Sequence, residues 1–353
     1  MRLSRPRLPA AAVPVIAVLL LPVAAARAET AQSELFAVQD PRITESSGLA
    51  ASALHADVYW THNDSGDQPR IYAIGADGRT KATVTLAGVQ ARDWEAISAG
   101  KDDAGRPVLF VGDIGDNKAE RSEVVVYRVA EPAELKDATV TPVKYRVRYA
   151  DGPRDAEALM ADPRSGKLYI ASKANQGAVY EQPAALSDSA VNTFTRVAAA
   201  PPVVTDGAFS PDGTRLILRG YFGATMYAAP GREIGTVSVP FQKQGESVTF
   251  TRDGRAVLFG SEGANSTVYR VALEGEAVPD MAAGRGTAVP QAVPPGPGSA
   301  PSAVPALPAP GGGDQDGDAG RPKEKAYGPG FLAVFGIVLT VYVVMKIRGR
   351  KKG

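Results

Sequence analysis

The sequence predicts an all-β fold in the form of a five-bladed β-propeller, with six blades as the alternative. A short phrase recurs five times along the chain, and each copy opens a stretch rich in β-branched and aromatic residues. The copies are separated by roughly 40 to 60 residues, and strand repeats of this period are typical of propeller blades. The five phrases are Glu45–Leu49, Asp93–Ile97, Asp155–Leu159, Thr205–Phe209 and Gln244–Val248.

Each of the first three copies is followed by further strand-like runs. Clusters of Gly, Pro or Asp separate these runs, as expected for strands joined by tight turns. The expected strands of the first three blades are Gly48–Ala51, Val58–Thr61, Arg70–Ile74 and Lys81–Leu86; Trp94–Ala99, Val108–Val111, Val124–Tyr127 and Val143–Tyr149; and Glu157–Met160, Leu168–Ala171, Ala178–Tyr180 and Thr193–Ala198.

The fifth copy lacks a fourth strand of its own. Because an unpaired sheet edge promotes aggregation, a ring of blades should close on itself. The one unassigned strand-like segment, Leu35–Gln39, precedes the first copy and is expected to complete the fifth blade, giving a propeller domain over residues 34–275. The expected strands of the last two blades are Gly207–Ser210, Leu216–Leu218, Ala224–Tyr227 and Thr236–Val239; and Glu246–Phe250, Ala256–Phe259 and Thr267–Val271.

The N-terminal residues have the pattern of a secretory signal peptide. Arg2, Arg5 and Arg7 form a basic region, and Ala10–Val23 is a short apolar run. Small residues then mark a cleavage site after Ala28, so residues 1–28 are expected to be removed.

The C-terminal part predicts a stalk and a membrane anchor. Residues 276–329 are rich in Pro, Gly and Ala and are expected to form a disordered spacer. The uncharged run Phe331–Met345 predicts a transmembrane helix over residues 330–346. The basic residues 347–353 predict a cytoplasmic tail. We therefore expect a single-pass type I protein of the cell membrane, with its propeller outside the cell.

Composition limits the chemistry of the chain. The formal net charge of +1 gives no support for nucleic-acid binding. The absence of cysteine excludes disulfides, thiol catalysis and cysteine metal sites. With two histidines in the chain, a three-histidine metal site is also excluded.

Several carboxylates fall at equivalent positions of successive blades. Aligning the phrases puts Glu95, Glu157 and Glu246 in one register, with Ser47 and Gly207 in the other two blades. Side chains two residues apart on a strand share a side, so Asp93 should accompany Glu95, and Asp155 should accompany Glu157. The loops after the second strands reach the same face of the ring. The candidate metal ligands are Glu95, Glu157, Glu246, Asp93, Asp155, Asp113 and Asp116.

The same face gathers further polar residues and one tryptophan. An oxygen-rich set of this kind suits Ca²⁺ better than Zn²⁺. The same acids could instead pair with cations or cap strand ends, and Trp94 could be core rather than a ligand platform. The candidate ligand-binding residues are His62, Asn63, Asp64, Asn117, Trp94, Lys173, Arg219 and Glu262.

The chain resembles known propeller families at several phrases. Trp60–Gly66, Asp93–Ile97 and Gly112–Asn117 resemble a group of poorly characterised secreted actinobacterial propellers, and Phe209–Leu216 resembles the turn signature of TolB-type repeats. The layout is more distantly similar to SdiA-regulated and phytase-like propellers, which are associated with calcium, and to lactonase propellers. Those families use six blades, and the phosphate-binding residues of phytases are not evident in this chain.

Three functions remain open from the sequence. The first is binding of an extracellular ligand or protein with Ca²⁺ assistance. The second is a metal-dependent hydrolase acting on a phosphoester or lactone. The third is a protein-interaction scaffold without a metal.

Overall fold

The computed structural model describes residues 32–228 and 231–285, and this part of the chain is all-β. Its one helical element is the short 3₁₀ helix η1 (Gly275–Ala277). The expected all-β fold is therefore confirmed. Within these residues no helix has the length and apolar character needed to cross a membrane. The expected signal peptide, most of the expected stalk, and the expected transmembrane helix and tail lie outside the described residues.

The first sheet contains five strands in the order β2-β3-β4-β5-β9. Four of them follow one another along the chain as antiparallel neighbours, as the turn pattern predicts. The fifth, β9, was not expected; it returns from the loop after β8 and pairs in parallel with β5. The strands are β2 (Leu49–Ala51), β3 (Val58–His62), β4 (Arg70–Gly75), β5 (Thr80–Leu86) and β9 (Ala138–Val140).

An eight-stranded sheet follows, and it consists of two antiparallel groups of four strands. The order is β11-β12-β13-β14-β10-β8-β7-β6, and the outer strands β10 and β14 join the two groups by parallel pairing. This junction leaves neither outer strand with a free edge. The strands are β6 (Trp94–Lys101), β7 (Pro107–Asp113), β8 (Val124–Ala130), β10 (Val143–Tyr149), β11 (Ala156–Ala161), β12 (Leu168–Ser172), β13 (Ala178–Glu181) and β14 (Val191–Ala199).

Two four-stranded sheets complete the described part. One has the order β15-β16-β17-β18, and the other has the order β1-β21-β20-β19. β1 pairs antiparallel with β21, which confirms that a strand near residue 35 completes the last sheet. The strands are β1 (Gln32–Ala37), β15 (Val204–Phe209), β16 (Arg215–Gly220), β17 (Ala224–Ala228), β18 (Arg232–Val237), β19 (Gly245–Phe250), β20 (Ala256–Ser261) and β21 (Thr267–Ala272).

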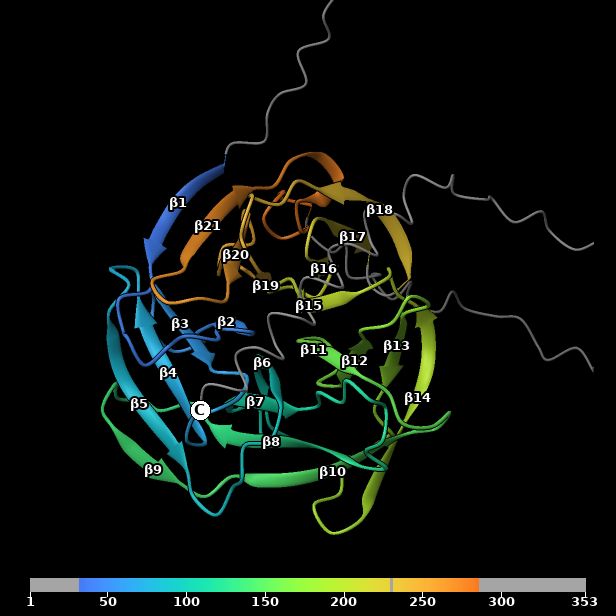
Figure 1. Cartoon of the computed structure of the whole chain (residues 1–353). Coiled ribbons are helices and arrows are strands. Elements are labelled where there is room, and N and C mark those ends of the chain that lie inside the picture. Colours follow the sequence, from blue (N-terminus) through green and yellow to red (C-terminus); the bar gives the residue numbers. More distant parts are fainter. Residues whose placement is uncertain (1–31, 229–230, 286–353) are drawn as a thin grey trace, which may run out of the picture. The chain divides into compact units, whose positions relative to one another are not determined.

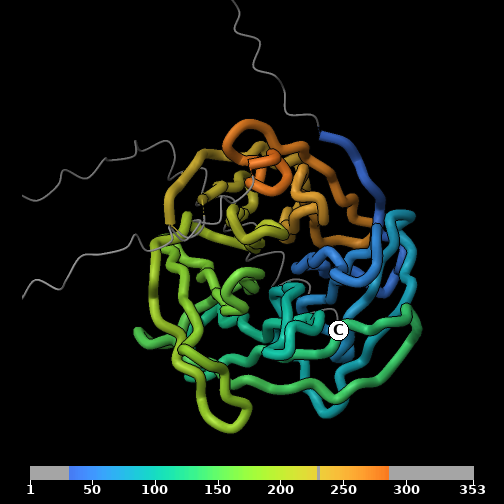
Figure 2. The backbone as a smooth tube through the Cα atoms, turned by 180° about the vertical axis from the view of Figure 1, so that it is seen from behind, coloured from blue at the N-terminus to red at the C-terminus, as the bar shows by residue number. Residues whose placement is uncertain are grey.

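The innermost strands surround a common centre. β2, β6, β11, β15 and β19 contact one another in that order, and β19 contacts β2 again (Figure 1). The backbone seen from behind shows the same arrangement of sheets around the centre (Figure 2). The starts of these inner strands therefore converge at one end of the centre, and their ends converge at the other.

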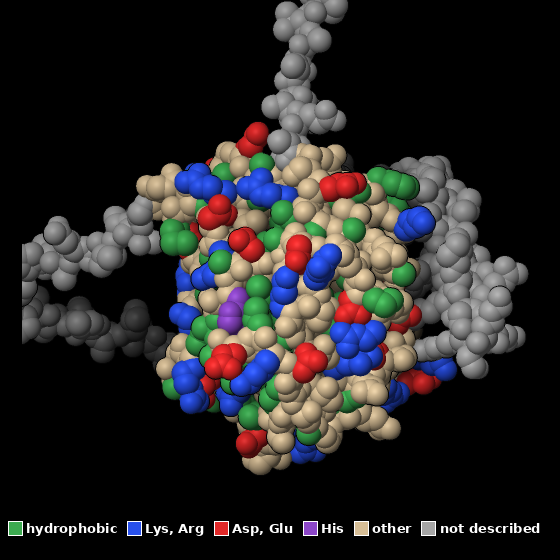
Figure 3. Space-filling model, turned by 90° about the vertical axis from the view of Figure 1, so that its left-hand side faces the viewer, with side chains coloured by type: hydrophobic (Ala, Val, Ile, Leu, Met, Phe, Trp, Pro, Cys, Tyr) green, Lys and Arg blue, Asp and Glu red, His purple; other side chains and the backbone are tan. Residues whose placement is uncertain are grey.

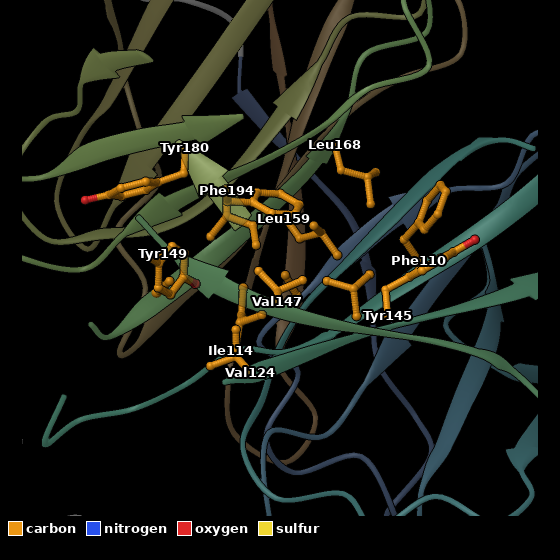
Figure 4. Packing of buried hydrophobic residues seen from close by; sticks show 14 of the residues in the cluster. Phe110, Ile114, Val124, Tyr145, Val147, Tyr149, Leu159, Leu168, Tyr180 and Phe194 are labelled. Atoms are coloured by element: carbon orange, nitrogen blue, oxygen red, sulfur yellow. The ribbon is translucent and has the colours of Figure 1, made fainter. Parts of the chain in front are cut away.

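Hydrophobic clusters fill the spaces between neighbouring sheets. The largest lies between the two halves of the eight-stranded sheet, where Val147 and Phe194 pack against Leu159 and Ile114 (Figure 4). These four side chains are fully buried. Each sheet thus buries both faces against its neighbours, which explains why the strands are rich in large apolar residues on both sides.

The outer surface carries mixed charge. On the side shown in Figure 3, Lys and Arg side chains alternate with Asp and Glu side chains. Local ion pairs also occur on the surface, such as Lys81 with Asp77 at 2.7 Å and Arg106 with Asp102 at 2.7 Å. The inner strand starts are different, because carboxylates predominate there.

The closing strand provides a test of the fold. Phe36 of β1 is buried against Tyr59, with ring centroids 5.6 Å apart. We expect Phe36→Ala to lower the free energy of unfolding by about 3 kcal/mol in urea titrations, because it leaves a cavity in the closing contact. The exposed neighbour Ser33 is the control, and Ser33→Ala should change stability by less than about 0.5 kcal/mol. Equal, small effects of both variants would contradict the closing role of β1.

Candidate functional site

Three glutamates occupy equivalent positions at the starts of inner strands. The pairing of β6 with β7 shifts register at Glu95, that of β11 with β12 shifts at Glu157, and that of β19 with β20 shifts between Gly245 and Val248, where Glu246 lies. Each glutamate is at most 3% exposed. An extra residue of this kind bends the strand and redirects its side chain. The register expected for these three residues is the register observed.

The fourth phrase differs from the expected alignment by two residues. In β15 the register shift falls between Val204 and Asp206, so Thr205, rather than Gly207, matches Glu95. Asp206 therefore lies one position further along the strand, where it is buried and fills a different role. The expected alignment matched Phe209 to the apolar residue that ends the other phrases. In the structure Gly207 occupies that position, and Phe209 lies two residues further along the strand.

Asp64, Asp93 and Glu95 bring three carboxylates together. One oxygen from each lies within 4.8 Å of the others. Backbone bonds hold the three segments in place: the Asp64 amide donates to the Glu45 carbonyl at 3.0 Å, and the Trp94 amide donates to the Asp64 carbonyl at 2.9 Å. The cluster thus joins the loop after β3 to the start of β6.

The surroundings of Glu95 disfavour the ionised form of its carboxyl group. Its pKa is raised well above the usual value by burial and then by the charges of Glu157, Asp64 and Asp93, while Lys173 acts in the opposite direction. Oε1 of Glu95 is buried and has no hydrogen-bond partner among the described residues. A buried charge without a partner is costly, so this oxygen requires a proton or a cation.

Gly115 forms one wall of the three-carboxylate cluster. A Cβ atom at this position would lie 2.6 Å from Oδ2 of Asp93 and 2.6 Å from Oε1 of Glu95. The Gly115 amide also donates to the Asp93 carbonyl at 3.2 Å. The absence of a side chain at Gly115 therefore leaves space beside both carboxylates.

The other two register glutamates have different partners. Glu157 pairs with Lys173, whose ammonium group lies 5.2 Å from the centre of the Tyr221 ring. Glu246 accepts a bond from Gln244 Nε2 at 3.4 Å. Burial and then the charge of Glu157 raise the pKa of Glu246 well above its usual value. Glu157 is thus the charge that acts on both Glu95 and Glu246.

Glu262 lies beside this group. It accepts a hydrogen bond from Ser47 Oγ at 2.7 Å and another from the Gln244 side chain. Ser47 is the first-blade residue in the register of Glu95, so Glu262 links two inner strand starts. We call Asp64, Asp93, Glu95, Glu157, Glu246, Glu262 and Lys173 the acidic mouth.

Asp113, Asp116 and Asp155 make structural contacts. Asp113 forms an ion pair with Arg121 at 2.8 Å, with both side chains buried. The Asp116 carboxylate accepts bonds from the amides of Glu120 and Arg121 at 3.0 and 2.8 Å. Asp155 Oδ1 accepts from the Asp116 amide at 2.8 Å. These acids order the loop between β7 and β8.

The remaining candidate residues divide between core and loop roles. His62 is fully buried, which lowers its pKa to about 4, and its ring lies 6.0 Å from the buried Trp94 ring. The Asn63 side chain binds the amides of Thr44 and Glu45 at 2.9 and 3.0 Å. Asn117 is exposed on the loop after β7.

Arg219 links the last two sheets. Its guanidinium donates to the carbonyls of Ser247 and Gly260 at 2.6 and 2.8 Å and to Gln242 Oε1 at 2.7 Å. Asp206, which sequence reasoning missed, accepts bonds from the amides of Val248 and Gly207, each at 2.7 Å. Asp206 stands within the fourth recurring phrase, and this position could have marked it as a candidate residue. The alignment of the phrases gave it no role.

Two exposed phenylalanines lie on loops of the last two sheets. Phe222 is 66% exposed at the tip of the β16–β17 turn, and Phe241 is 92% exposed on the loop that leads into β19. The bond from Arg219 to Gln242 joins the bases of these two loops.

The chain matches no protein-family model and no curated protein at a significant level.

The raised pKa of Glu95 predicts a pH-dependent stability. The folded state retains a proton that the unfolded state releases above a pH of about 4.3, so Glu95 destabilises the fold increasingly as pH rises above that value. With chelator present, the stability of Glu95→Gln relative to the native chain should rise between pH 5 and pH 7.5, by up to about 1.4 kcal/mol per pH unit.

Urea titrations at several pH values measure this difference. The lowered pKa of His62 acts in the opposite direction between pH 6.5 and 4, but it is common to both proteins and cancels in the comparison. A difference that is constant with pH would contradict the raised pKa of Glu95.

Proposed function

We propose that this chain is a ligand-binding module whose acidic mouth holds a Ca²⁺ ion that assists binding. The observation that carries the proposal is the cluster of Asp64, Asp93 and Glu95 oxygens within 4.8 Å of one another. Oxygens bound to one Ca²⁺ at 2.3–2.6 Å can lie at most about 5 Å apart, so all three fit a single ion. The cation would also neutralise the buried Oε1 of Glu95.

The three carboxylates suit Ca²⁺ but do not fill all of its coordination positions. Carboxylate oxygens are hard ligands, and none of the three residues offers nitrogen or sulfur, which Zn²⁺ prefers. Ca²⁺ takes six to eight oxygens, so three carboxylates leave positions for water or for oxygens of a ligand. An ion at this place would supply a positive charge that orients an oxygen-bearing ligand over the mouth.

Exposed aromatic residues support ligand binding at the same end of the ring. Tyr221 lies against Lys173 of the acidic mouth, and the exposed ring of Phe222 lies 6.3 Å from the Tyr221 ring. Aromatic rings provide large contact area with little loss of conformational freedom. The acidic mouth and these loops together could therefore form one binding surface.

We also propose that the sheets form a five-bladed propeller displayed outside the cell. The cyclic contacts of the five inner strands support this count. A crystal structure with a sixth sheet would contradict it. The basic, apolar and Pro-rich sequence at the ends of the chain supports export, a stalk and a single membrane span, with an extracellular ligand or protein as partner.

A metal-dependent hydrolase is the second candidate. Glu95 and Glu246, with raised pKa values, lie near Glu157, which forms an ion pair with Lys173. Carboxyl groups with different protonation preferences can serve as general acid and base. Turnover of phosphoester or lactone substrates that requires Ca²⁺ would favour this reading over binding alone.

Calcium titration tests the proposed function. Ca²⁺ at a hundredfold excess over Kd should stabilise the fold by about 2.7 kcal/mol, and chelator should reverse the gain. Glu95→Gln should abolish the effect because it removes a charged ligand, and Gly115→Ala should weaken it because the added methyl group crowds both carboxylates.

The exposed Glu233 on β18 provides the matched control, and Glu233→Gln should respond to Ca²⁺ like the native chain. Calorimetric titration with Ca²⁺ measures binding directly. Binding of equal strength to the native chain and to Glu95→Gln would place the ion elsewhere and exclude the proposed site.

Display at the cell surface is tested by protease treatment of intact cells. Because the Pro- and Gly-rich segment 276–329 should be cleaved readily, protease should release a soluble fragment that contains the sheets. Immunoblotting of medium and cells measures the release. Complete protection of the chain in intact cells, with cleavage only after lysis, would contradict the topology.

A further inference from the structure

The ring has a hollow at the end opposite the acidic mouth. This cavity has a volume of about 300 Å³. Its walls come from the later residues of all five inner strands and from the turns that follow them. We call it the turn-side cavity. Ligand pockets range from about 300 to 1,000 Å³, so the volume suits a small molecule.

The wall of the turn-side cavity is mainly apolar. Ile97, Phe209 and Phe250 contribute large side chains, and Ala51 and Ala99 contribute small ones. Small residues on inner strands leave the centre of the ring open. A compact apolar body would therefore find contacts on all sides.

The charged residues of the lining are predominantly basic. Lys101 is the last residue of β6, and Arg252 lies in the turn after β19. Both side chains are exposed, and neither forms a side-chain hydrogen bond or ion pair among the described residues. The one acidic lining residue, Asp162, is buried and accepts bonds from the Arg164 amide at 2.9 Å and from Ser165 Oγ at 2.7 Å. The cations thus remain available, whereas the carboxylate is used within its own turn.

We propose that the turn-side cavity binds a small organic anion, with its apolar body in the ring and its carboxylate at Lys101 and Arg252. A guanidinium group can donate two parallel hydrogen bonds to a carboxylate, so Arg252 is the expected anchor. This site is separate from the acidic mouth. Its proposed ligand is an anion, whereas the proposed ligand of the acidic mouth is a cation.

A neighbouring hollow of about 450 Å³ shares Ala51 and Arg252 with this cavity. Lys101 lines the turn-side cavity but not its neighbour. The effect of a substitution at Lys101 therefore distinguishes the two places.

The test uses three probes of similar shape: benzoate, benzamide and benzamidinium. Their binding to the full chain in phospholipid nanodiscs is measured by saturation-transfer NMR and calorimetry, with empty nanodiscs as the blank. Benzoate should bind at least about tenfold more tightly than the neutral or cationic probe, because a charge-assisted hydrogen bond is lost in both of the others.

Two substitutions should weaken benzoate binding by about tenfold each: Arg252→Gln and Lys101→Gln. Arg255 lies in the same turn but outside the lining, and Arg255→Gln should leave binding unchanged. Ala51→Leu should weaken binding by filling the cavity without a change of charge. Chelator should have no effect, which separates this proposal from the calcium site.

Other results would overturn the proposal. Equal binding of the three probes would show that the basic residues do not select an anion. Benzoate binding that is sensitive to Arg252→Gln but not to Lys101→Gln would place the ligand in the neighbouring hollow. Absence of benzoate binding to the native chain, with a normal melting profile, would exclude the site for this class of ligand.

Discussion

The pairing of β1 with β21 holds the first and last strands of the described region in one sheet. Without it, the last sheet would expose the edge of β21, and the cluster around Phe36 and Tyr59 would lose its cover. With it, every sheet has neighbours on both faces, and the starts of the five inner strands are forced together. That convergence crowds carboxylates that lie far apart in the sequence, and the proposed chemistry depends on it.

Crowding produces two kinds of acidic residue. Asp113, Asp116 and Asp206 contact arginine or backbone amides that order nearby loops and strands. Glu95 lacks such partners at Oε1, and burial together with neighbouring charges raises its pKa. An apolar residue of similar size would cost less at this position. The proposed cation would offset the cost of the buried carboxylate.

Much of the fold could be predicted from sequence because strands and turns leave local patterns. The closing strand near Leu35 and the register of Glu95, Glu157 and Glu246 followed from the repeat. β9 could not be predicted, since it belongs to no recurring phrase and its parallel pairing with β5 leaves no turn between the two strands. The register of the fourth phrase was misjudged because Gly207 stands where the other copies have a large apolar side chain.

The candidate site was predicted less completely, because loops decide which acids meet. Asp64 follows β3 rather than opening a phrase, and only the folded loop brings it to Asp93 and Glu95. The pairing of Glu157 with Lys173 likewise depends on how far two strand ends approach each other. Sequence reasoning placed these acids on one face of the predicted ring but could not assign their partners.

The most direct test of the calcium proposal is a crystal structure of the chain grown with Ca²⁺ at neutral pH, with anomalous scattering used to locate the ion. The account predicts one ion within about 2.6 Å of oxygens from Asp64, Asp93 and Glu95. No anomalous peak at these residues, with Glu95 Oε1 instead hydrogen-bonded as a protonated carboxyl group, would contradict it.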